Sequence, residues 1–187
     1  MKTKDELRHR IRVRRAQLTL AEIDERGRAA VENLHTLPEL QNAQSLACYL
    51  SKTFEVQTQR FIESCLSAGK RVCVPRHIDG QRGYAWSWVV PGGAWRDGPW
   101  RIAEPAHYQA VDAEELDIAI VPAVAVDTAG NRLGHGGGNV DRLIRDVQAP
   151  RVALVFDFQV LDSVPVNDHD VPVQLIVSEK DVYRVER

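Results

Sequence analysis

The first third of the chain has two helical patterns, each opened by the same local motif. Thr3 and Thr19 both stand three residues before a glutamate, which is the arrangement of a capping box at a helix start. We expect one helix from there to about residue 16, and a second helix that ends before Pro38. The second helix carries an apolar stripe formed by Ile23, Ala30, Val31 and Leu34.

Beyond Pro38 the pattern changes to short apolar runs that alternate with helical segments. Strands are expected at residues 45–50, 71–75, 84–90, 117–126, 151–156, 173–179 and 181–185. Helices are expected at about 58–68 and 139–147, and a loop-rich crossing at 91–105. This alternation predicts an α/β fold with a largely parallel open sheet, flanked by helices and preceded by a helical N-terminus. No linker divides the sequence, so we expect a single domain over residues 1–187.

The composition is that of a globular protein, with 44% hydrophobic and 27% charged residues among 187. A net charge of −2 argues against a general nucleic-acid binder. The longest apolar stretch, residues 118–126, is too short to span a bilayer, and the charged first residues are unlike a secretory signal. Cys48, Cys65 and Cys73 cannot all pair within one chain and form no CxxC motif, which indicates reduced thiols in a cytoplasmic protein without a zinc site.

Basic residues gather at the N-terminus, in contrast to the nearly balanced charge of the whole chain. Residues 1–15 contain Lys2, Lys4, Arg8, Arg10, Arg12, Arg14 and Arg15. Such a run is most often a solvated helix face. The alternative is an anion-binding site, because Lys4 and Arg8 are four residues apart and share one face of the predicted helix.

The strongest candidate for chemistry is a glycine-rich segment between the strand ending at residue 126 and the helix expected from residue 139. Four of the five residues 134–138 are glycines, which allow positive φ angles and let amide N–H groups converge on one point. The start of the following helix and the flanking Arg132 and Arg142 favour a phosphate site over a merely flexible loop. The segment is neither a Walker A loop nor a Rossmann motif, because no Gly-Lys-Ser/Thr is present and position 139 is Asn.

Two acidic positions are candidates for holding a metal ion. Asp141 comes just after the glycine-rich segment, and Asp170 ends the polar segment 167–170. Carboxylate oxygens suit Mg²⁺, which takes one or two of them and completes its shell with phosphates and water. The alternative for residues 167–170 is a polar turn before Pro172. The sequence contains no credible Ser/His/Asp or Cys/His nucleophile set.

These motifs resemble those of the 5-formyltetrahydrofolate cyclo-ligase family (5,10-methenyltetrahydrofolate synthetase). Residues 131–142 are similar to its Arg-Leu-Gly-x-Gly-x-Gly-Tyr-Tyr-Asp signature. Residues 4–8 resemble its Lys-x-x-x-Arg segment that contacts ATP, residues 50–58 its folate-contacting segment, and residues 102–105 its Ile-x-Glu-Pro. Residues 164–170 resemble the segment that carries a second magnesium-linked Asp. The match follows the same order over nearly the whole chain.

The resemblance implies a reaction in which 5-formyltetrahydrofolate and ATP give 5,10-methenyltetrahydrofolate, ADP and phosphate, with Mg²⁺ as cofactor. It implies catalytic roles for Arg132 and Asp141, and metal binding by Asp141 and Asp170. It assigns ATP contacts to Lys4, Arg8, Arg132, Leu133, Gly134, His135, Gly136, Gly137, Gly138, Asn139, Val140 and Asp141. It assigns folate contacts to Leu50, Glu55, His135, Gly136, Gly137, Gly138 and Asn139. Activation by phosphorylation needs positioning and charge stabilisation rather than a protein nucleophile.

The chain departs from the family pattern at the two tyrosines, which are Asn139 and Val140 here, and at Gln174, where an Asp is expected. The aromatic part of the folate site is therefore altered, and another aromatic side chain could fill the space. The candidates are Trp86, Trp88, Trp95 and Trp100. Two other functions stay open from the residues alone. One is an isomerase or transferase acting on a sugar phosphate or CoA ester, and the other is a non-catalytic folate- or nucleotide-binding relative.

Overall fold

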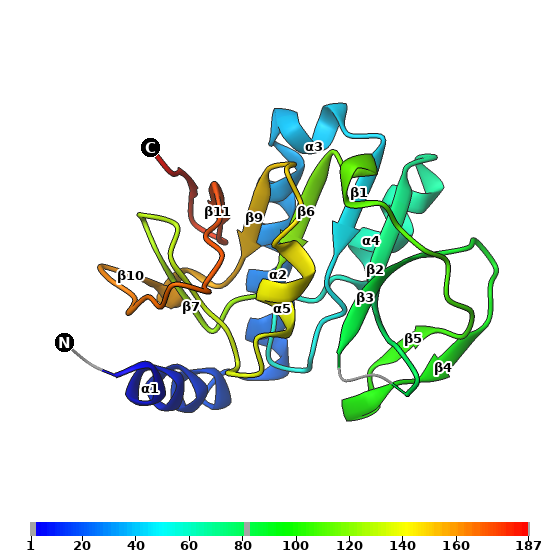
Figure 1. Ribbon diagram of the computed structural model, residues 1–187. Helices are drawn as coiled ribbons and strands as arrows, with labels where there is room; N and C mark the ends of the chain where they lie inside the picture. The colour runs from blue at the N-terminus through cyan, green and yellow to red at the C-terminus, as the bar shows by residue number, and fades with distance from the viewer. Residues whose placement is uncertain (1–2, 81–82, 187) are drawn as a thin grey trace.

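The fold is built on a seven-stranded sheet in the computed structural model, which describes residues 3–80 and 83–186 except for the side chain of Trp100 (Figure 1). The strand order is β12-β11-β9-β6-β1-β2-β3. The strands are β1 (Ser45–Cys48), β2 (Arg71–His77), β3 (Tyr84–Trp88), β6 (Ile118–Val121), β9 (Arg151–Leu154), β11 (Leu175–Val177) and β12 (Val182–Arg184). The five inner strands pair in parallel, and only the edge strands β3 and β12 are antiparallel to their neighbours. The predicted α/β fold with a largely parallel sheet is confirmed.

Five α-helices accompany this sheet in the described part of the chain. They are α1 (Lys4–Ala16), α2 (Leu20–His35), α3 (Pro38–Asn42), α4 (Gln59–Ser67) and α5 (Asn139–Ile144). Both predicted capping boxes are present, since Thr3 and Thr19 each accept a hydrogen bond from the amide N–H three residues on and receive the glutamate in return. The predicted helical N-terminus is therefore confirmed. None of the described helices is long and apolar enough to cross a bilayer.

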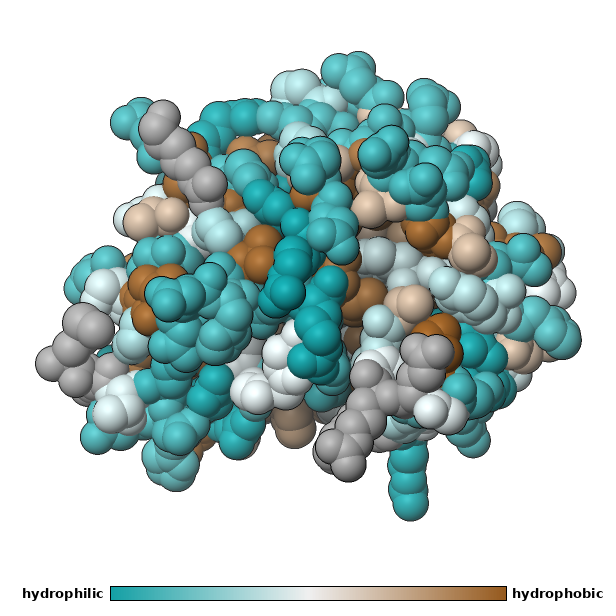
Figure 2. All heavy atoms as spheres, viewed as in Figure 1, coloured by the Kyte–Doolittle hydropathy of each residue, from teal (hydrophilic) through white to brown (hydrophobic). Residues whose placement is uncertain are grey.

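The sheet is buried on both faces, as expected for parallel strands. Large side chains such as Leu46 and Ile120 pack on the face covered by α2 and α4. The opposite face, covered by α5, carries small residues such as Ala47 and Ala119. Figure 1 shows α2 behind the sheet and α5 in front of it. Hydrophilic residues cover most of the face shown in Figure 2, where hydrophobic residues are exposed only in separate patches.

A second, three-stranded sheet was not predicted, and it explains why the expected strand 117–126 is divided. The chain leaves the large sheet at Pro122, and the N–H of Val124 donates to the carbonyl of Leu133 instead. The small sheet has the order β10-β7-β8, with β7 (Ala125–Asp127), β8 (Arg132–Leu133) and β10 (Val160–Leu161). This change of sheet brings the segment after β8 back over the carboxyl end of β6.

Other predicted elements differ in extent. The segment 91–105, expected to be loop-rich, contains a hairpin of β4 (Trp95–Asp97) and β5 (Ala103–Pro105). The helix expected at 139–147 ends at Ile144, because the chain tightens into a turn in which the Val147 N–H donates to the Ile144 carbonyl. Three short 3₁₀ helices complete the described elements, at Pro99–Arg101, Ala113–Glu115 and Asp157–Gln159.

The turn between β7 and β8 is held by Asp127, whose side chain is buried. Its carboxylate accepts hydrogen bonds from the N–H groups of Ala129, Asn131 and Val164 and from the side-chain amide of Asn131. Gly130 closes the turn with a φ of +83°, and its backbone pairs with Val173. The turn therefore connects the small sheet to the chain that follows it.

We expect Gly130→Ala to destabilise the protein much more than Gly69→Ala. Both glycines have a positive φ, which costs an alanine about 1 kcal/mol. A Cβ at position 130 would lie 2.3 Å from the Val173 carbonyl oxygen, whereas one at position 69 has no atom within 4 Å. The clash should add about 1–3 kcal/mol. Urea unfolding of the two variants measures the difference, and equal losses of stability would contradict this account.

Candidate functional site

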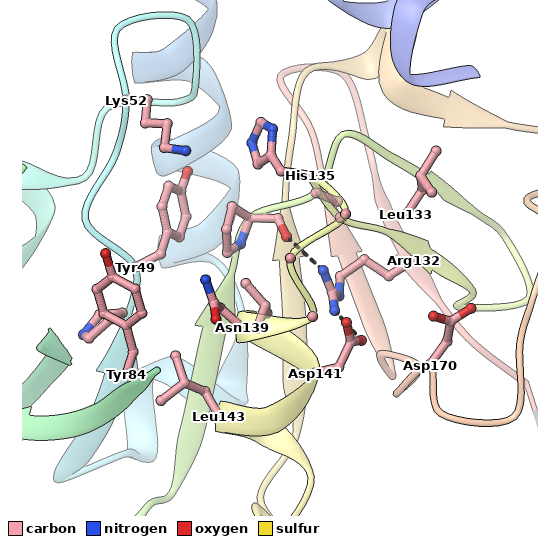
Figure 3. A pocket seen from close by; sticks show the side chains of 18 of the residues that line it. Tyr49, Lys52, Tyr84, Arg132, Leu133, His135, Asn139, Asp141, Leu143 and Asp170 are labelled. Carbon is pink, nitrogen blue, oxygen red and sulfur yellow. Dashed lines mark hydrogen bonds and ion pairs between the residues drawn. The ribbon is translucent and has the colours of Figure 1, made fainter. Parts of the chain in front are cut away.

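A cavity of about 490 Å³ lies where the glycine-rich segment meets the carboxyl ends of β1 and β6 (Figure 3). Tyr49 and Leu50 follow β1 directly, and Pro122 and Ala123 follow β6. The carboxyl ends of parallel strands are where ligands bind in open α/β sheets. The lining includes Lys4, Arg8, Leu50, Glu55, Arg132, Leu133, Gly134, His135, Gly136, Gly137, Gly138, Asn139, Val140, Asp141 and Asp170. The structure thus brings together every residue that the sequence predicted for ATP, folate or metal.

The glycine-rich loop, residues 134–138, presents its backbone rather than side chains. Within the part of the chain that the structure describes, no amide N–H of this loop donates a hydrogen bond. Gly136 and Gly138 have φ angles of +103° and +64°. A Cβ at Gly134 would lie 3.2 Å from Arg132, and one at Gly136 would lie 3.5 Å from Arg8. Glycine therefore allows both the loop conformation and the close approach of two guanidinium groups.

Helix α1 contributes two of its basic residues to this loop. The Nε of Arg8 donates to the Gly134 carbonyl at 3.0 Å, and its Nη1 pairs with Asp5 at 2.6 Å. Lys4 pairs with Asp170. The Lys4 and Arg8 side chains are only 18% and 17% exposed, so these two do not form a solvated face. Arg10, Arg12 and Arg14 are exposed, Arg15 is buried, and Lys2 lies outside the described residues.

Arg132 is a buried cation held by a carboxylate. Its side chain has no exposed surface, and its Nη2 donates to Asp141 at 2.5 Å. Burial lowers the pKa of the guanidinium, and the carboxylates of Asp141 and Asp170 act in the opposite direction. The Nε of Arg132 has no hydrogen-bond partner among the described residues. Figure 3 shows Arg132 and Asp141 pointing toward each other, on the opposite side of the cavity from Tyr49 and Tyr84.

Asp141 and Asp170 have the donor chemistry that Mg²⁺ requires. The N–H of Val171 donates to the same Asp141 oxygen that receives Arg132, so Asp141 lies beside the segment that carries Asp170. In each carboxylate one oxygen, Oδ2 of Asp141 and Oδ1 of Asp170, accepts no hydrogen bond from the described residues. No group of three or more acidic, His or Cys side chains among the described residues could hold a metal alone. Two carboxylates fit an ion that also binds phosphates and water.

The polar-turn interpretation of residues 167–170 is also correct. The Asn167 N–H donates to the Asp170 carboxylate at 2.7 Å, which closes the turn. Asp168 is exposed and does not line the cavity, whereas His169 does. Asp170 therefore holds its own turn and faces the cavity at the same time.

Glu55 is buried, with 5% of the residue exposed, although it follows a strand end in a loop. Its Oε1 lies 3.0 Å from Nε2 of His135 and 3.9 Å from Arg15, and its Oε2 accepts the Lys52 N–H at 2.9 Å. Burial opposes ionisation, but the hydrogen bonds from His135 and Lys52 and the charge of Arg15 hold the Glu55 pKa below its ordinary value. Sequence reasoning missed Arg15 as a partner of Glu55, because the two residues are forty positions apart.

The two positions that replace the signature tyrosines have different surroundings. Asn139 faces the cavity and its Oδ1 accepts a hydrogen bond from Arg142 at 2.5 Å, while Val140 also packs against the core beside α5. Arg142 turns back onto Asn139 and the Gly137 carbonyl and does not line the cavity, contrary to its predicted place beside the phosphate site. Gln174 is structural, since it bonds to the backbone of Arg151.

The tryptophans proposed to replace the tyrosines do not do so where the structure describes them. Trp86 is buried and its indole N–H donates to the Leu143 carbonyl, Trp88 lies under Arg71, and Trp95 lines a neighbouring cavity. The aromatic residues that line the main cavity are Tyr49 and Tyr84. Sequence reasoning missed both, although Tyr49 stands directly after a buried strand. The side chain of Trp100 lies outside the described part.

The fold and the cavity together define an α/β protein with an anion-binding pocket at the carboxyl edge of a parallel sheet. The model of the 5-formyltetrahydrofolate cyclo-ligase family matches residues 1–179, and the chain belongs to this family of ligase-class enzymes. The chain is 32% identical over 179 residues to the 5-formyltetrahydrofolate cyclo-ligase of Escherichia coli K12, which covers 92% of this chain and 98% of that one.

Solved structures agree with this assignment. The NMR structure of 5,10-methenyltetrahydrofolate synthetase from Aquifex aeolicus superposes with a TM-score of 0.87 at 30% identity, covering 98% of this chain and 93% of the other. A 5,10-methenyltetrahydrofolate synthetase from Mycoplasma pneumoniae shares the fold, with a TM-score of 0.74 at 20% identity over 95% of this chain and 99% of the other. The resemblance stated from the motifs is confirmed.

The contact between Lys4 and Asp170 predicts a measurable acid titration. Burial opposes ionisation of Asp170, but Lys4 and the Asn167 N–H hold its pKa below the ordinary value. A carboxylate whose pKa is lowered by folding adds stability above its unfolded pKa of about 3.9, and this is lost as the pH falls through the lower folded pKa. Lys4→Met should raise the Asp170 pKa and shrink the acid-dependent part of the stability.

NMR titration of the Asp170 carboxyl carbon without added metal measures this shift directly. Lys180→Met is the matched control, because Lys180 pairs with Asp157 and not with Asp170. The control should leave the Asp170 pKa unchanged. An Asp170 pKa that is the same in Lys4→Met and the unaltered protein would show that Lys4 contributes nothing to it.

Proposed function

We propose that the chain, acting as one domain, catalyses the ATP- and Mg²⁺-dependent cyclisation of 5-formyltetrahydrofolate to 5,10-methenyltetrahydrofolate, with release of ADP and phosphate. One observation carries the proposal. The unpaired N–H groups of the loop 134–138 and the cations Lys4, Arg8 and Arg132 line one cavity. Backbone N–H groups and guanidinium or ammonium groups are the partners that phosphate oxygens prefer. Family membership supports the folate as the second substrate.

The residues suit a reaction that depends on positioning and on charge. The formyl oxygen of the substrate is a poor leaving group, so it first takes the γ-phosphoryl group from ATP and ADP is released. The N10 amine then attacks the activated carbon, loses its proton, and phosphate departs as the ring closes. Lys4, Arg8 and the loop N–H groups would hold the phosphates, and Arg132 would stabilise charge on the transferred group. No protein nucleophile is required.

Asp141 and Asp170 would hold Mg²⁺, which when bound supplies positive charge against the phosphate oxygens. Arg132 already balances Asp141 in the structure, so phosphates at this position would share both the arginine and the acidic pair. A ligand that brings its own cation therefore changes the net charge of this wall less than a bare anion would. This argument favours the magnesium complex of ATP over free ATP.

The other side of the cavity suits the reduced folate. Leu50, Tyr84 and Ile102 offer apolar and aromatic surface, and Glu55 offers a carboxylate that can accept N–H groups of the pterin. Asn139 stands between the two sides in Figure 3. We propose that the folate lies here, with its formyl group toward Arg132 and the glycine-rich loop.

The decisive experiment measures absorbance of the methenyl product from 5-formyltetrahydrofolate with and without ATP. We expect product only when both ATP and Mg²⁺ are present, with ADP formed in equal amount. Tight folate or nucleotide binding without product would instead identify a non-catalytic relative. Turnover of a sugar phosphate or CoA ester without ATP consumption would overturn the proposal.

Lys4→Ala and Arg8→Ala should each raise the KM for ATP by roughly ten- to hundredfold. The reason is that loss of one charged phosphate contact costs about 1.5–3 kcal/mol. Arg10→Ala is the matched control, since Arg10 is exposed on the same helix and faces a different groove. Steady-state kinetics at saturating folate give the comparison. Unchanged ATP kinetics in both variants would return α1 to a structural role.

A further inference from the structure

Glu55 and His135 form a side-chain pair at the cavity that the proposed reaction does not use. They belong to different segments, the loop after β1 and the glycine-rich loop, and they meet at 3.0 Å. Glu55 is nearly inaccessible, whereas the His135 side chain is 37% exposed and lines the cavity beside it. The histidine therefore occupies one oxygen of a carboxylate that a folate would have to reach.

The Glu55 carboxylate has few positions left for a ligand. Oε2 accepts the Lys52 N–H, and Arg15 approaches Oε1 from α1 on the side of the protein interior. Only His135 among these three partners is a side chain with substantial exposure. Displacing the Lys52 N–H would move the backbone, and displacing Arg15 would expose a buried cation. His135 is the partner that a ligand can replace at least cost.

The position of His135 allows such a displacement. It stands between Gly134 and Gly136, and its side chain is more than one-third exposed. In the family signature this position is the variable x between two glycines, so the histidine is a feature of this chain and not of the shared motif. Rotation of a partly exposed side chain is a fast and low-cost motion.

The geometry points to His135 as a residue that competes with the reduced folate for the Glu55 carboxylate and so sets the folate affinity. This inference rests on the proposed function and goes beyond it, because it assigns His135 an effect opposite to that of a binding contact. A folate that uses Glu55 must first break the Glu55–His135 contact. The strength of that contact then subtracts from the observed affinity.

Protonation of His135 should strengthen the competing contact. An imidazolium bonded to a carboxylate forms a stronger hydrogen bond than a neutral imidazole does. Glu55 remains ionised, because its pKa is held below the ordinary value. The pair should therefore be tightest below about pH 6.5, where histidine carries its proton. Folate affinity should fall as the pH falls through this range.

Other charged groups surround the pair but do not titrate in this range in their ordinary forms. Arg15 comes from α1, and Arg8, from the same helix, approaches Gly136. Lys52 comes from the loop after β1, and burial raises the pKa of Tyr49 well above its ordinary value. His169 is the other histidine that lines the cavity, and it lies 3.9 Å from Asp170. His169 therefore serves as the control.

The test measures the dissociation constant of 5-formyltetrahydrofolate by calorimetry, without ATP, at pH 6 and pH 8. The unaltered protein should bind roughly three- to tenfold more weakly at pH 6, as expected for one linked proton. His135→Gln keeps a hydrogen-bonding side chain without titration, so the pH dependence should vanish. His135→Leu removes the competitor, so its binding at pH 6 should be tighter than that of the unaltered protein and independent of pH. His169→Gln should keep the original pH dependence.

The outcomes separate this inference from the proposed function. Weaker binding by His135→Leu at both pH values would make His135 a folate contact and overturn the inference. A pH dependence that persists in His135→Gln, or is absent from the unaltered protein that still binds and turns over the folate, would also overturn it and leave the proposed function intact. Failure of the unaltered protein to bind 5-formyltetrahydrofolate at either pH would refute both. Circular dichroism at both pH values verifies that each variant is folded.

Discussion

The buried carboxylate of Asp127 positions the second half of the site. Its four hydrogen bonds fix the turn between β7 and β8 and reach across to Val164. Arg132 and the glycine-rich loop follow that turn on one side, and the segment carrying Asp170 follows Val164 on the other. A single buried acceptor with all its donors in place thus sets the relative position of two segments that are far apart in the sequence. Buried carboxylates are tolerated only when hydrogen bonded in this way.

Charge around the cavity is balanced pair by pair. Lys4 faces Asp170, Arg132 faces Asp141, and Glu55 faces both Arg15 and His135. Each pair joins segments that the sequence separates widely, so the pairs both neutralise charge and hold the walls together. Because ligand groups must exchange with these partners, affinity depends on the differences between contacts rather than on their number. The acidic side chains are therefore as important for selectivity as the basic ones.

The sequence was most informative where function and local structure share a short motif. The capping boxes at Thr3 and Thr19 predicted both helix starts, and the glycine-rich loop with its neighbours predicted one side of the cavity. The small sheet was not predictable, because β8 and β10 are two residues long and gain their stability from distant partners. Local patterns carry no information on such pairings.

Side-chain partners were also beyond the sequence. The tryptophans drew attention as large aromatic residues, yet Trp86 and Trp88 serve packing, and Tyr84 faces the cavity because β3 pairs with β2 in one particular register. Arg142 was expected at the phosphate site from its spacing alone, but its guanidinium finds nearer acceptors in Asn139 and Gly137. The choice among neighbouring acceptors depends on distances that spacing along the chain does not give.

The docking of α1 has a consequence for the order in which the protein is made. Lys4 meets a partner 166 residues later in the chain, and Arg8 one that is 126 residues later. At about 5–20 residues per second, a ribosome needs on the order of ten seconds to synthesise that length. During that time the first helix exists without the acidic residue that it will face. The cavity is therefore completed late in synthesis, after most strands of the large sheet have emerged.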